Sequence, residues 1–236
     1  MKNFKFLLVS LTTFLVLVTS CGGEVIDLRD AKVEIYIEYK KTVLNYKGIP
    51  FSGTIKDDDG GGAKHKNWRS WEIEYDEGLK NGTYTSYYHS GQMSEEGFYK
   101  DNYQDGVWIN YFDLEELGYK LEDFLDELPI NSIKNYRSDN LHGVEEIYYL
   151  VTPKYGNPYA ALLTKTTLIS TKADLALAHG AYEEYLFDSS GDYSGQLVRK
   201  GTYHNGRLQG ADSTWYGGPD YALKASVQYK DGVIMD

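Results

Sequence analysis

The chain has 236 residues, of which 42% are hydrophobic and only 5 are proline, so the composition favours a folded protein over a disordered or proline-rich one. The formal net charge of -11 argues against nucleic acid as a partner and against direct binding of the fold to anionic lipid. The single cysteine excludes an internal disulfide framework and a multi-cysteine metal site.

Residues 1 to 20 predict a lipoprotein signal peptide. A short basic stretch is followed at residues 6 to 18 by an apolar run that is too short to span a bilayer comfortably. Residues 18 to 21 read Val-Thr-Ser-Cys and resemble the bacterial lipobox, whose cysteine is diacylated and becomes the new amino terminus. The alternatives are an ordinary secreted protein and an uncleaved anchor helix. We expect acyl chains on Cys21 to hold the protein to a membrane.

Residues 21 to 45 predict a tether followed by a capping strand. Gly22 and Gly23 form a flexible connection after Cys21. Lipoprotein sorting in Gram-negative bacteria, by resemblance, favours the outer membrane where no Asp follows the lipidated cysteine, as is the case here. Residues 33 to 40 alternate between apolar and polar side chains, which predicts a strand with one buried face that caps the fold.

Residues 46 to 236 contain an internal repeat in which Tyr is followed by Gly seven positions later. A second rule places an aromatic residue two positions after the Gly and a bulky pair five and six positions after it. Gly180 obeys the second rule although Ala173 replaces its upstream Tyr, and a further unit opens at Tyr229. The Tyr and Gly pairs are Tyr46 and Gly53, Tyr75 and Gly82, Tyr99 and Gly106, Tyr136 and Gly143, and Tyr203 and Gly210.

Each repeat reads as two strands and two turns. Aromatic and β-branched residues favour strands, and Ser90-Gly91, Asn205-Gly206 and Asp231-Gly232 are typical of tight hairpin turns. A unit this short cannot bury its own apolar face, so neighbouring units must stack. The sequence therefore predicts an all-β fold, a repetitive antiparallel β-hairpin meander or solenoid.

Two segments depart from the repeat. Residues 113 to 128 carry leucines at helical spacing, with Asp113 as a candidate N-cap and Pro129 as a stop, which predicts a short helical insert. This helix would pack on the sheet or, alternatively, bind a partner. Residues 152 to 171 combine a Pro- and Gly-containing turn with alternating Leu, Thr and Ile, which predicts a longer hairpin.

The aromatic residues of the repeat form two rows on opposite faces of the sheet, because adjacent strand residues point to opposite sides. Residues two and six positions after each Gly share one face. Residues five positions after it share the other face and form a candidate binding row. The alternative is that both rows are structural, and the sequence leaves open which face is exposed to solvent. The candidate row consists of Tyr87, Tyr111, Tyr148, Tyr185 and Trp215.

The sequence contains no recognisable catalytic or metal motif. Four histidines, His89, His142, His179 and His204, raise the alternative of a metal site or a general base. His142 and His179, however, stand directly before a repeat Gly, in a slot that other copies fill with Ser, Asn, Asp or Gln. Residues 57 to 59 are three aspartates followed by glycines, which reads as a solvated loop or, alternatively, a loose calcium loop. We expect no cofactor, no metal and no enzymatic activity.

The repeat at residues 82 to 112 resembles the bacterial variant of the MORN repeat, whose units read approximately Gly-x-Trp-x-x-Tyr-Tyr-x-x-Gly and then Glu-Gly-x-Tyr-x-x-Gly. The fit is fair at residues 201 to 216 and weak elsewhere. The resemblance implies a β-hairpin scaffold, found often in exported proteins or lipoproteins, some of which are labelled antitoxins.

These observations together predict a membrane-anchored binding or scaffolding module of the cell envelope with an unidentified protein or glycan partner. One alternative is an immunity or antitoxin protein, for which the negative charge would suit a basic toxin. A less favoured alternative is a hydrolase of envelope glycans, which would need two carboxylates that the fold brings together.

Overall fold

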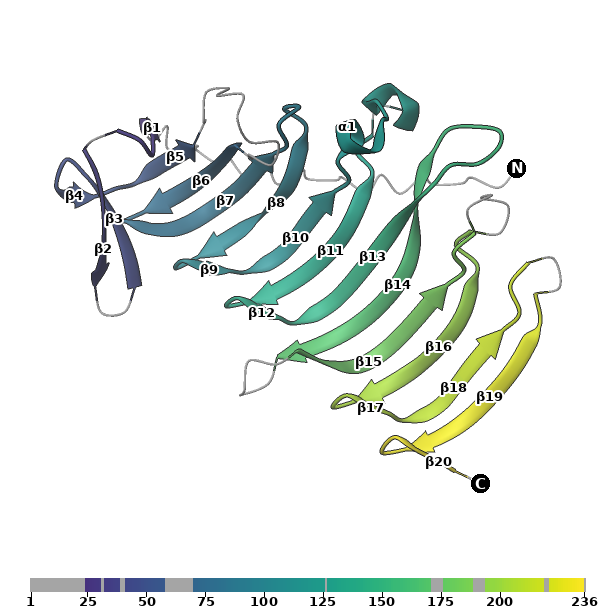
Figure 1. Ribbon diagram of the computed structural model, residues 1–236. Helices are drawn as coiled ribbons and strands as arrows, with labels where there is room; N and C mark the ends of the chain where they lie inside the picture. Colours follow the sequence, from purple (N-terminus) through teal and green to yellow (C-terminus); the bar gives the residue numbers. More distant parts are fainter. Residues whose placement is uncertain are drawn as a thin grey trace, which may run out of the picture.

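The computed structural model is a long, curved single-layer β-sheet with a small second sheet at its N-terminal end (Figure 1). The structure describes residues 24–30, 32–38, 41–57, 70–125, 127–170, 176–188, 194–218 and 221–235. Cys21, the signal peptide, Asp58, Asp59 and Ala173 lie outside these residues. The described strands confirm the predicted all-β antiparallel meander.

The large sheet is built by strands that pair with their neighbours in chain order. All of these pairings are antiparallel except that of β1 (Glu24–Asp27), which lies parallel to β5 (Gly53–Asp57). Its longer strands after β5 are β6 (Ser70–Asp76), β7 (Leu79–Tyr87), β8 (Met93–Lys100), β10 (Gly106–Tyr111), β11 (Ile130–Arg137), β13 (Gly143–Val151), β14 (Tyr159–Ser170), β15 (Ala176–Tyr185), β16 (Leu197–His204), β18 (Gly210–Trp215) and β19 (Leu223–Lys230). Its two-residue strands are β9 (Tyr103–Gln104), β12 (Asn140–Leu141), β17 (Arg207–Leu208) and β20 (Val233–Ile234).

The two-residue strands close tight hairpins next to the repeat tyrosines. Both turn residues have positive φ, as in Asp101-Asn102 and Asn205-Gly206, which matches a type I′ turn and the right-handed twist of the strands. Ser90-Gly91 differs from this pattern, because it lies in a longer connection in which only Gly91 has positive φ. Two of the three predicted turn dipeptides therefore form the expected tight turn.

The repeat Gly and Tyr positions are linked across the sheet. The Gly that ends one unit pairs across the sheet with the Tyr that opens the next, for example Gly82 with Tyr99. Gly82 has a φ of 138°, and an added Cβ there would collide with the side chain of Glu74. Gly143 is the exception, because its cross-strand partner is Leu168. The remaining pairs are Gly53 with Tyr75, Gly106 with Tyr136, Gly180 with Tyr203, and Gly210 with Tyr229.

A β-bulge recurs at the opposite end of each unit after the first, whose strand β5 pairs with β6 without a register shift. In β8, Ser94 is the extra residue, because Ser86 pairs with Glu95 and Tyr87 pairs with Met93. The same register shift follows the fourth residue after the Gly in four further strand pairs. Bulges strengthen the local twist of a sheet. We attribute the curvature in Figure 1 to this repeated irregularity.

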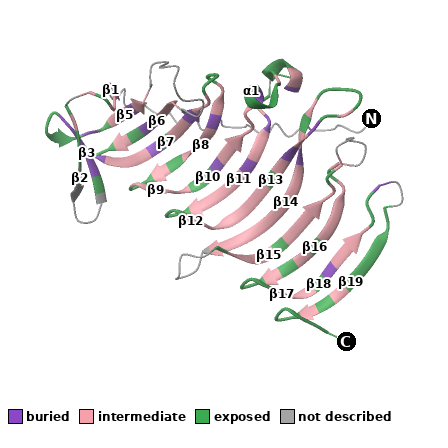
Figure 2. Ribbon diagram, in the orientation of Figure 1, coloured by how far each residue is buried: buried purple, intermediate pink, exposed green. Residues whose placement is uncertain are grey.

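The N-terminal strands form a separate three-stranded sheet of β2 (Val33–Glu38), β3 (Lys41–Tyr46) and β4 (Ile49–Pro50). Leu44 and Tyr46 of β3 are buried with residues of the large sheet such as Ile55. Buried residues gather at this end, whereas β19 is largely exposed (Figure 2). The strand predicted at residues 33 to 40 is present over Val33–Glu38, and Tyr39 and Lys40 lie outside the described residues. The expectation of a buried face is wrong at Ile35, whose side chain is 59% exposed.

The predicted helix at residues 113 to 128 is only partly correct. Asp113 caps the short helix α1 (Leu114–Leu117) by accepting a hydrogen bond from the Glu116 amide. Gly118, with a φ of 78°, ends α1, and a 3-10 turn follows at Leu121–Phe124. Because the helix stops at this glycine and the next helical turn is separate, the leucines do not share one helix face. Leu114 alone among them is fully buried in the described residues.

The predicted longer hairpin at residues 152 to 171 is present. It consists of β13 and β14, which pair from Gly143 with Leu168 to Val151 with Tyr159. The connecting loop contains Pro153 and Pro158. At its base Tyr149, Val151 and Ala161 form a small buried cluster.

Candidate functional site

Two aromatic rows run across the sheet on opposite faces. Trp108 stands two positions and Tyr111 five positions after Gly106 on β10. Glu96 pairs with Ile109 and accepts a hydrogen bond of 2.6 Å from the Tyr111 hydroxyl. Because neighbouring residues of a strand point to opposite faces, this contact places Tyr111 on the face opposite Trp108.

We call the face that carries Trp108 the packed face. Trp108 is 1% exposed, and its ring stacks on Tyr84 with 5.2 Å between ring centroids. Tyr99 and Tyr136 meet the same ring edge-on at 5.1 Å and 6.2 Å. The indole N–H donates to the backbone carbonyl of Phe98. The rings two positions after the Gly and the repeat tyrosines therefore form structural core.

The opposite face, which we call the outer face, carries the candidate row predicted from sequence. Its five members are half-buried. Successive members are separated by one intervening strand, which sets a spacing of about 10 Å between them. Phe98 and Val107 point to the same face and are 42% and 50% exposed. The outer row consists of Tyr87 on β7, Tyr111 on β10, Tyr148 on β13, Tyr185 on β15 and Trp215 on β18.

Carboxylates on the outer face hold the hydroxyls of the central tyrosines. Tyr148 donates to Glu146 at 2.7 Å, and Tyr185 donates to Glu183 at 2.8 Å. Burial, followed by these hydrogen bonds, raises the pKa of both tyrosines to about 12. The same two causes raise the pKa of Tyr111. Each ring is thus fixed at its tip as well as at its backbone.

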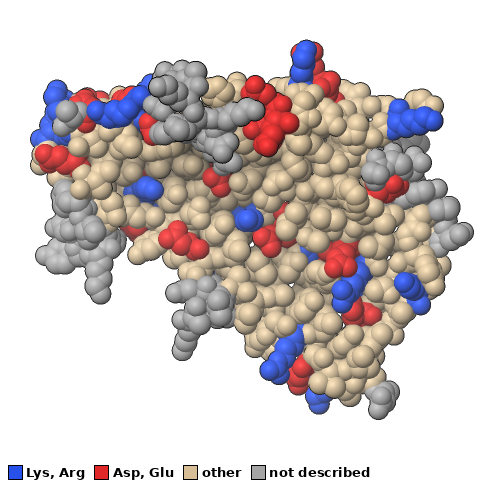
Figure 3. Space-filling model, in the orientation of Figure 1, with Lys and Arg blue, Asp and Glu red and all other residues tan. Residues whose placement is uncertain are grey.

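Charged residues join these carboxylates into a ladder across the strands. Lys165 of β14 pairs with Glu146 on one side and with Glu183 on the other. Its ammonium lies 2.7 Å from Glu146, and this contact is the largest cause of a lowered pKa of the Glu146 carboxyl. Lys, Arg, Asp and Glu are scattered among uncharged residues over the side of the molecule seen in Figure 3. That side has no extended area of one charge.

The two ends of the outer row differ from its centre. Trp215 has no carboxylate partner of this kind, and the ammonium of Lys200 lies 5.6 Å from its ring centroid. Burial, with a smaller contribution from the charge of Glu72, raises the pKa of Tyr87. The row is therefore uniform in spacing but not in polar contacts.

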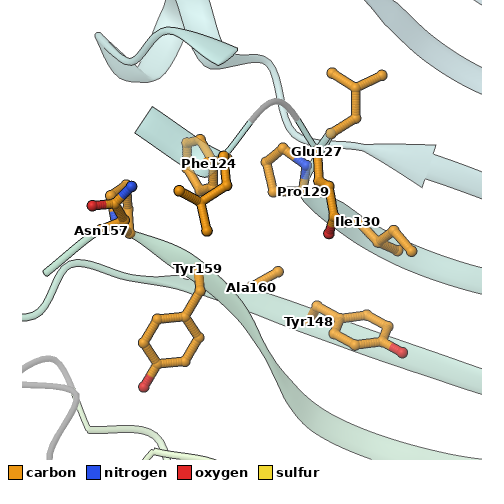
Figure 4. Close-up of a pocket in the computed structure, with 11 residues that line it drawn as sticks. Phe124, Glu127, Pro129, Ile130, Tyr148, Asn157, Tyr159 and Ala160 are labelled. Atoms are coloured by element: carbon orange, nitrogen blue, oxygen red, sulfur yellow. The ribbon is translucent and has the colours of Figure 1, made fainter. Parts of the chain in front are cut away.

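A hollow of about 410 Å³ adjoins the row at Tyr148, between the helical insert and the β13–β14 hairpin (Figure 4). Phe124 and Pro129 line one side, and Tyr159 and Ala160 line the other. The lining is mostly apolar, with Glu127 and Asn157 as polar members. The exposed edge of this hollow widens the outer face around Tyr148.

The carboxylate partners of the row were not predicted as site residues. Glu146 and Glu183 each stand three positions after a repeat Gly and two before a row tyrosine, which was the available signal. Adjacent acids of one strand point to opposite faces, as Glu183 and Glu184 show. Tyr185 donates to the first of these residues, and Tyr182, on the packed face, donates to the second.

Compared with profiles of known protein families and with the sequences of curated proteins, the chain matches none. The resemblance to the MORN-variant repeat therefore stays a prediction. Within the part of the chain that the structure describes, no helix combines the length and apolar character needed to cross a membrane.

Proposed function

We propose that this protein is a non-catalytic binding module of the cell envelope, anchored through acyl chains on Cys21, and that its ligand contacts the outer row. One observation carries the proposal. Five half-buried rings stand at equal intervals on the outer face, and carboxylates on that face fix the hydroxyls of three of them.

Rings held in this way are suited to binding. A half-buried ring keeps an accessible part of its apolar surface, and a fixed hydroxyl limits the conformational entropy that the side chain loses when a ligand docks. The Glu146 carboxylate has further acceptor positions beyond its contacts with Tyr148 and Lys165. This carboxylate can therefore accept hydrogen bonds from polar groups of a ligand that lies on the neighbouring aromatic rings.

The arrangement of the row favours an extended ligand. Four intervals of about 10 Å give a row of roughly 40 Å that crosses the strands. A small molecule would cover one or two of these rings, whereas a glycan strand or an extended peptide would cover most of them. The hollow beside Tyr148 offers an apolar contact near the middle of the row.

Crosslinking in intact cells followed by pull-down tests this proposal. The native protein is compared with a Tyr87→Ala/Tyr111→Ala/Trp215→Ala variant at matched abundance and stability. The control variant Tyr103→Ala/Tyr155→Ala/Tyr221→Ala also loses three exposed rings, which lie outside the row. We expect one specific partner to disappear with the row variant only.

The outcomes separate the alternatives. A partner list that is the same for native protein and row variant would return the outer row to a structural role. Capture of a basic toxin as the specific partner would support the antitoxin hypothesis and would overturn the scaffold hypothesis.

The anchor is tested independently. Cys21→Ser should release the protein from the membrane fraction and abolish incorporation of labelled fatty acid, because acyl chains supply the proposed attachment. A Cys21→Ser protein that remained in the membrane fraction would contradict the anchor without affecting the proposed binding face.

A further inference from the structure

Two histidines from adjacent strands lie side by side on the sheet. His179 of β15 and His204 of β16 each stand one residue beyond the cross-strand pair of Gly180 and Tyr203. Their ring centroids are 4.7 Å apart, with 47° between the ring planes. His179 is half-buried and His204 is exposed, so both rings can be reached from solvent.

The separation of these rings matches that of two imidazoles on one metal ion. A metal to nitrogen distance of about 2.0 to 2.1 Å and a tetrahedral or square arrangement place the two ring centroids about 4.5 to 5.2 Å apart. The observed 4.7 Å falls within this range. The hairpin backbone therefore already supplies the spacing that chelation requires.

Asn205 provides the outer contact that orients a metal-binding histidine. Its side-chain oxygen lies 3.3 Å from Nδ1 of His179. In the tautomer that carries its proton on Nδ1, His179 donates to this oxygen and leaves Nε2 free as a ligand. The backbone N–H of Asn205 lies 3.4 Å from the same nitrogen and is the donor in the other tautomer. Metal binding would select the first tautomer.

We propose that His179 and His204 bind one divalent transition-metal ion, and that they bind Cu²⁺ more tightly than Zn²⁺. Imidazole nitrogens prefer these ions, and Cu²⁺ accepts two nitrogens with water or other oxygens in a tetragonal arrangement. No group of three or more His, Cys, Asp or Glu side chains that could hold a metal occurs among the described residues. The remaining coordination positions are therefore assigned to water.

One neighbouring charge opposes the ion. Arg207 of β17 pairs directly with His204 across the tight turn, so the two side chains leave the same face of the sheet from neighbouring strands. Like charges repel, and removal of this one should strengthen metal binding. Arg207→Gln thus supplies a change in the direction opposite to that of ligand removal.

The experiment is a Cu²⁺ titration of the full-length protein with the Cys21 thiol acylated or alkylated, followed by calorimetry and electron paramagnetic resonance. We expect one ion per chain, two coupled nitrogens in the spectrum, and a loss of affinity of about tenfold or more in both His179→Ala and His204→Ala, because each loses chelation. His89→Ala is the control, since it removes an exposed histidine elsewhere and should change nothing.

The double variant His179→Ala/His204→Ala still contains the other three of the five histidines of the chain. Copper binding of native strength in this variant, or a native spectrum without two coupled nitrogens, would overturn the site. A rise in melting temperature with Cu²⁺ that requires both histidines is also expected, since the ion links β15 to β16 and binds only the folded hairpin. These readouts are independent of the outer row, so their failure leaves the proposed binding function untouched.

Discussion

Gly97→Ala tests how tightly the rings of the packed face are packed around the strand that lies between them. Gly97 lies between Tyr84 and Trp108 on the middle strand of this aromatic group. An alanine methyl carbon there would lie 2.7 Å from Cε3 of Trp108 and still closer to Cδ2 and Cε2. Gly97 does not have a positive φ, so a loss of stability would report packing alone and not backbone strain.

The expected cost follows from how little the indole can move. Trp108 is 1% exposed and is enclosed by Tyr84, Tyr99 and Tyr136. Extra atoms in a well-packed core cost about 1 to 3 kcal/mol, and the enclosure favours the upper end, about 3 kcal/mol. For a protein of this size, that corresponds to a decrease in melting temperature of about 6 to 12 °C.

Gly201→Ala is the matched control. Gly201 occupies the same Gly-x-Tyr position, but the nearest atom to an added Cβ is Asp212 Oδ1, at 3.1 Å. A carboxylate can yield by a few tenths of an ångström, and alanine restricts the unfolded chain, so we expect a net change within about 1 kcal/mol. Both variants are followed by urea unfolding with circular dichroism. Equal midpoints for the two alanine variants would refute the packing argument, as would an undiminished cost of Gly97→Ala in a Trp108→Val background.

Three further predictions follow from the polar contacts. The protein should lose stability between pH 10 and about pH 12, because burial and a carboxylate raise the pKa of Tyr148 and of its neighbours in the outer row, so that the unfolded chain loses these protons first. An ultraviolet titration in which all tyrosines ionise near pH 10 without unfolding would contradict this. Ser86 and Ser94 share a buried hydrogen bond of 2.7 Å, so each single alanine variant should cost about 1 to 2 kcal/mol in urea unfolding and the double variant less than their sum; strict additivity would argue against coupling. Arg199→Ala should destabilise the protein more than Asp212→Ala, because it leaves the 8% exposed carboxylate of Asp212 without the guanidinium that lies 2.9 Å away, whereas Arg199 alone can turn to solvent. The reverse order of melting temperatures would show that this reasoning is wrong.

The repeat could be predicted because its spacing reflects backbone requirements that are local. The turn after Tyr203 needs two residues with positive φ, and Asn205-Gly206 supplies them within three positions of the tyrosine. Gly210 then opens the next strand, opposite the tyrosine of the following unit. Each of these demands falls on a residue type that is recognisable in the sequence.

The separate N-terminal sheet and the interrupted helix could not be predicted in the same way. Ile35 alternates with polar residues as a half-buried strand residue would, yet nothing in the local pattern states whether a second layer will cover it. Gly118 ends α1 by adopting a left-handed conformation, although an isolated glycine within a leucine periodicity is often tolerated. Both outcomes depend on tertiary contacts.

The two faces of the sheet acquire different roles from one strand alternation. On the packed face, small residues such as Gly97 and Ser86 leave room for the rings of neighbouring strands, and these rings bury one another. Glu96, the residue directly before Gly97, points to the outer face, where its carboxylate accepts a hydrogen bond from the Tyr111 hydroxyl and so holds that ring. A ring held by a polar contact does not need a covering layer. The same repeat can therefore build its core on one face and keep a rigid, accessible aromatic row on the other.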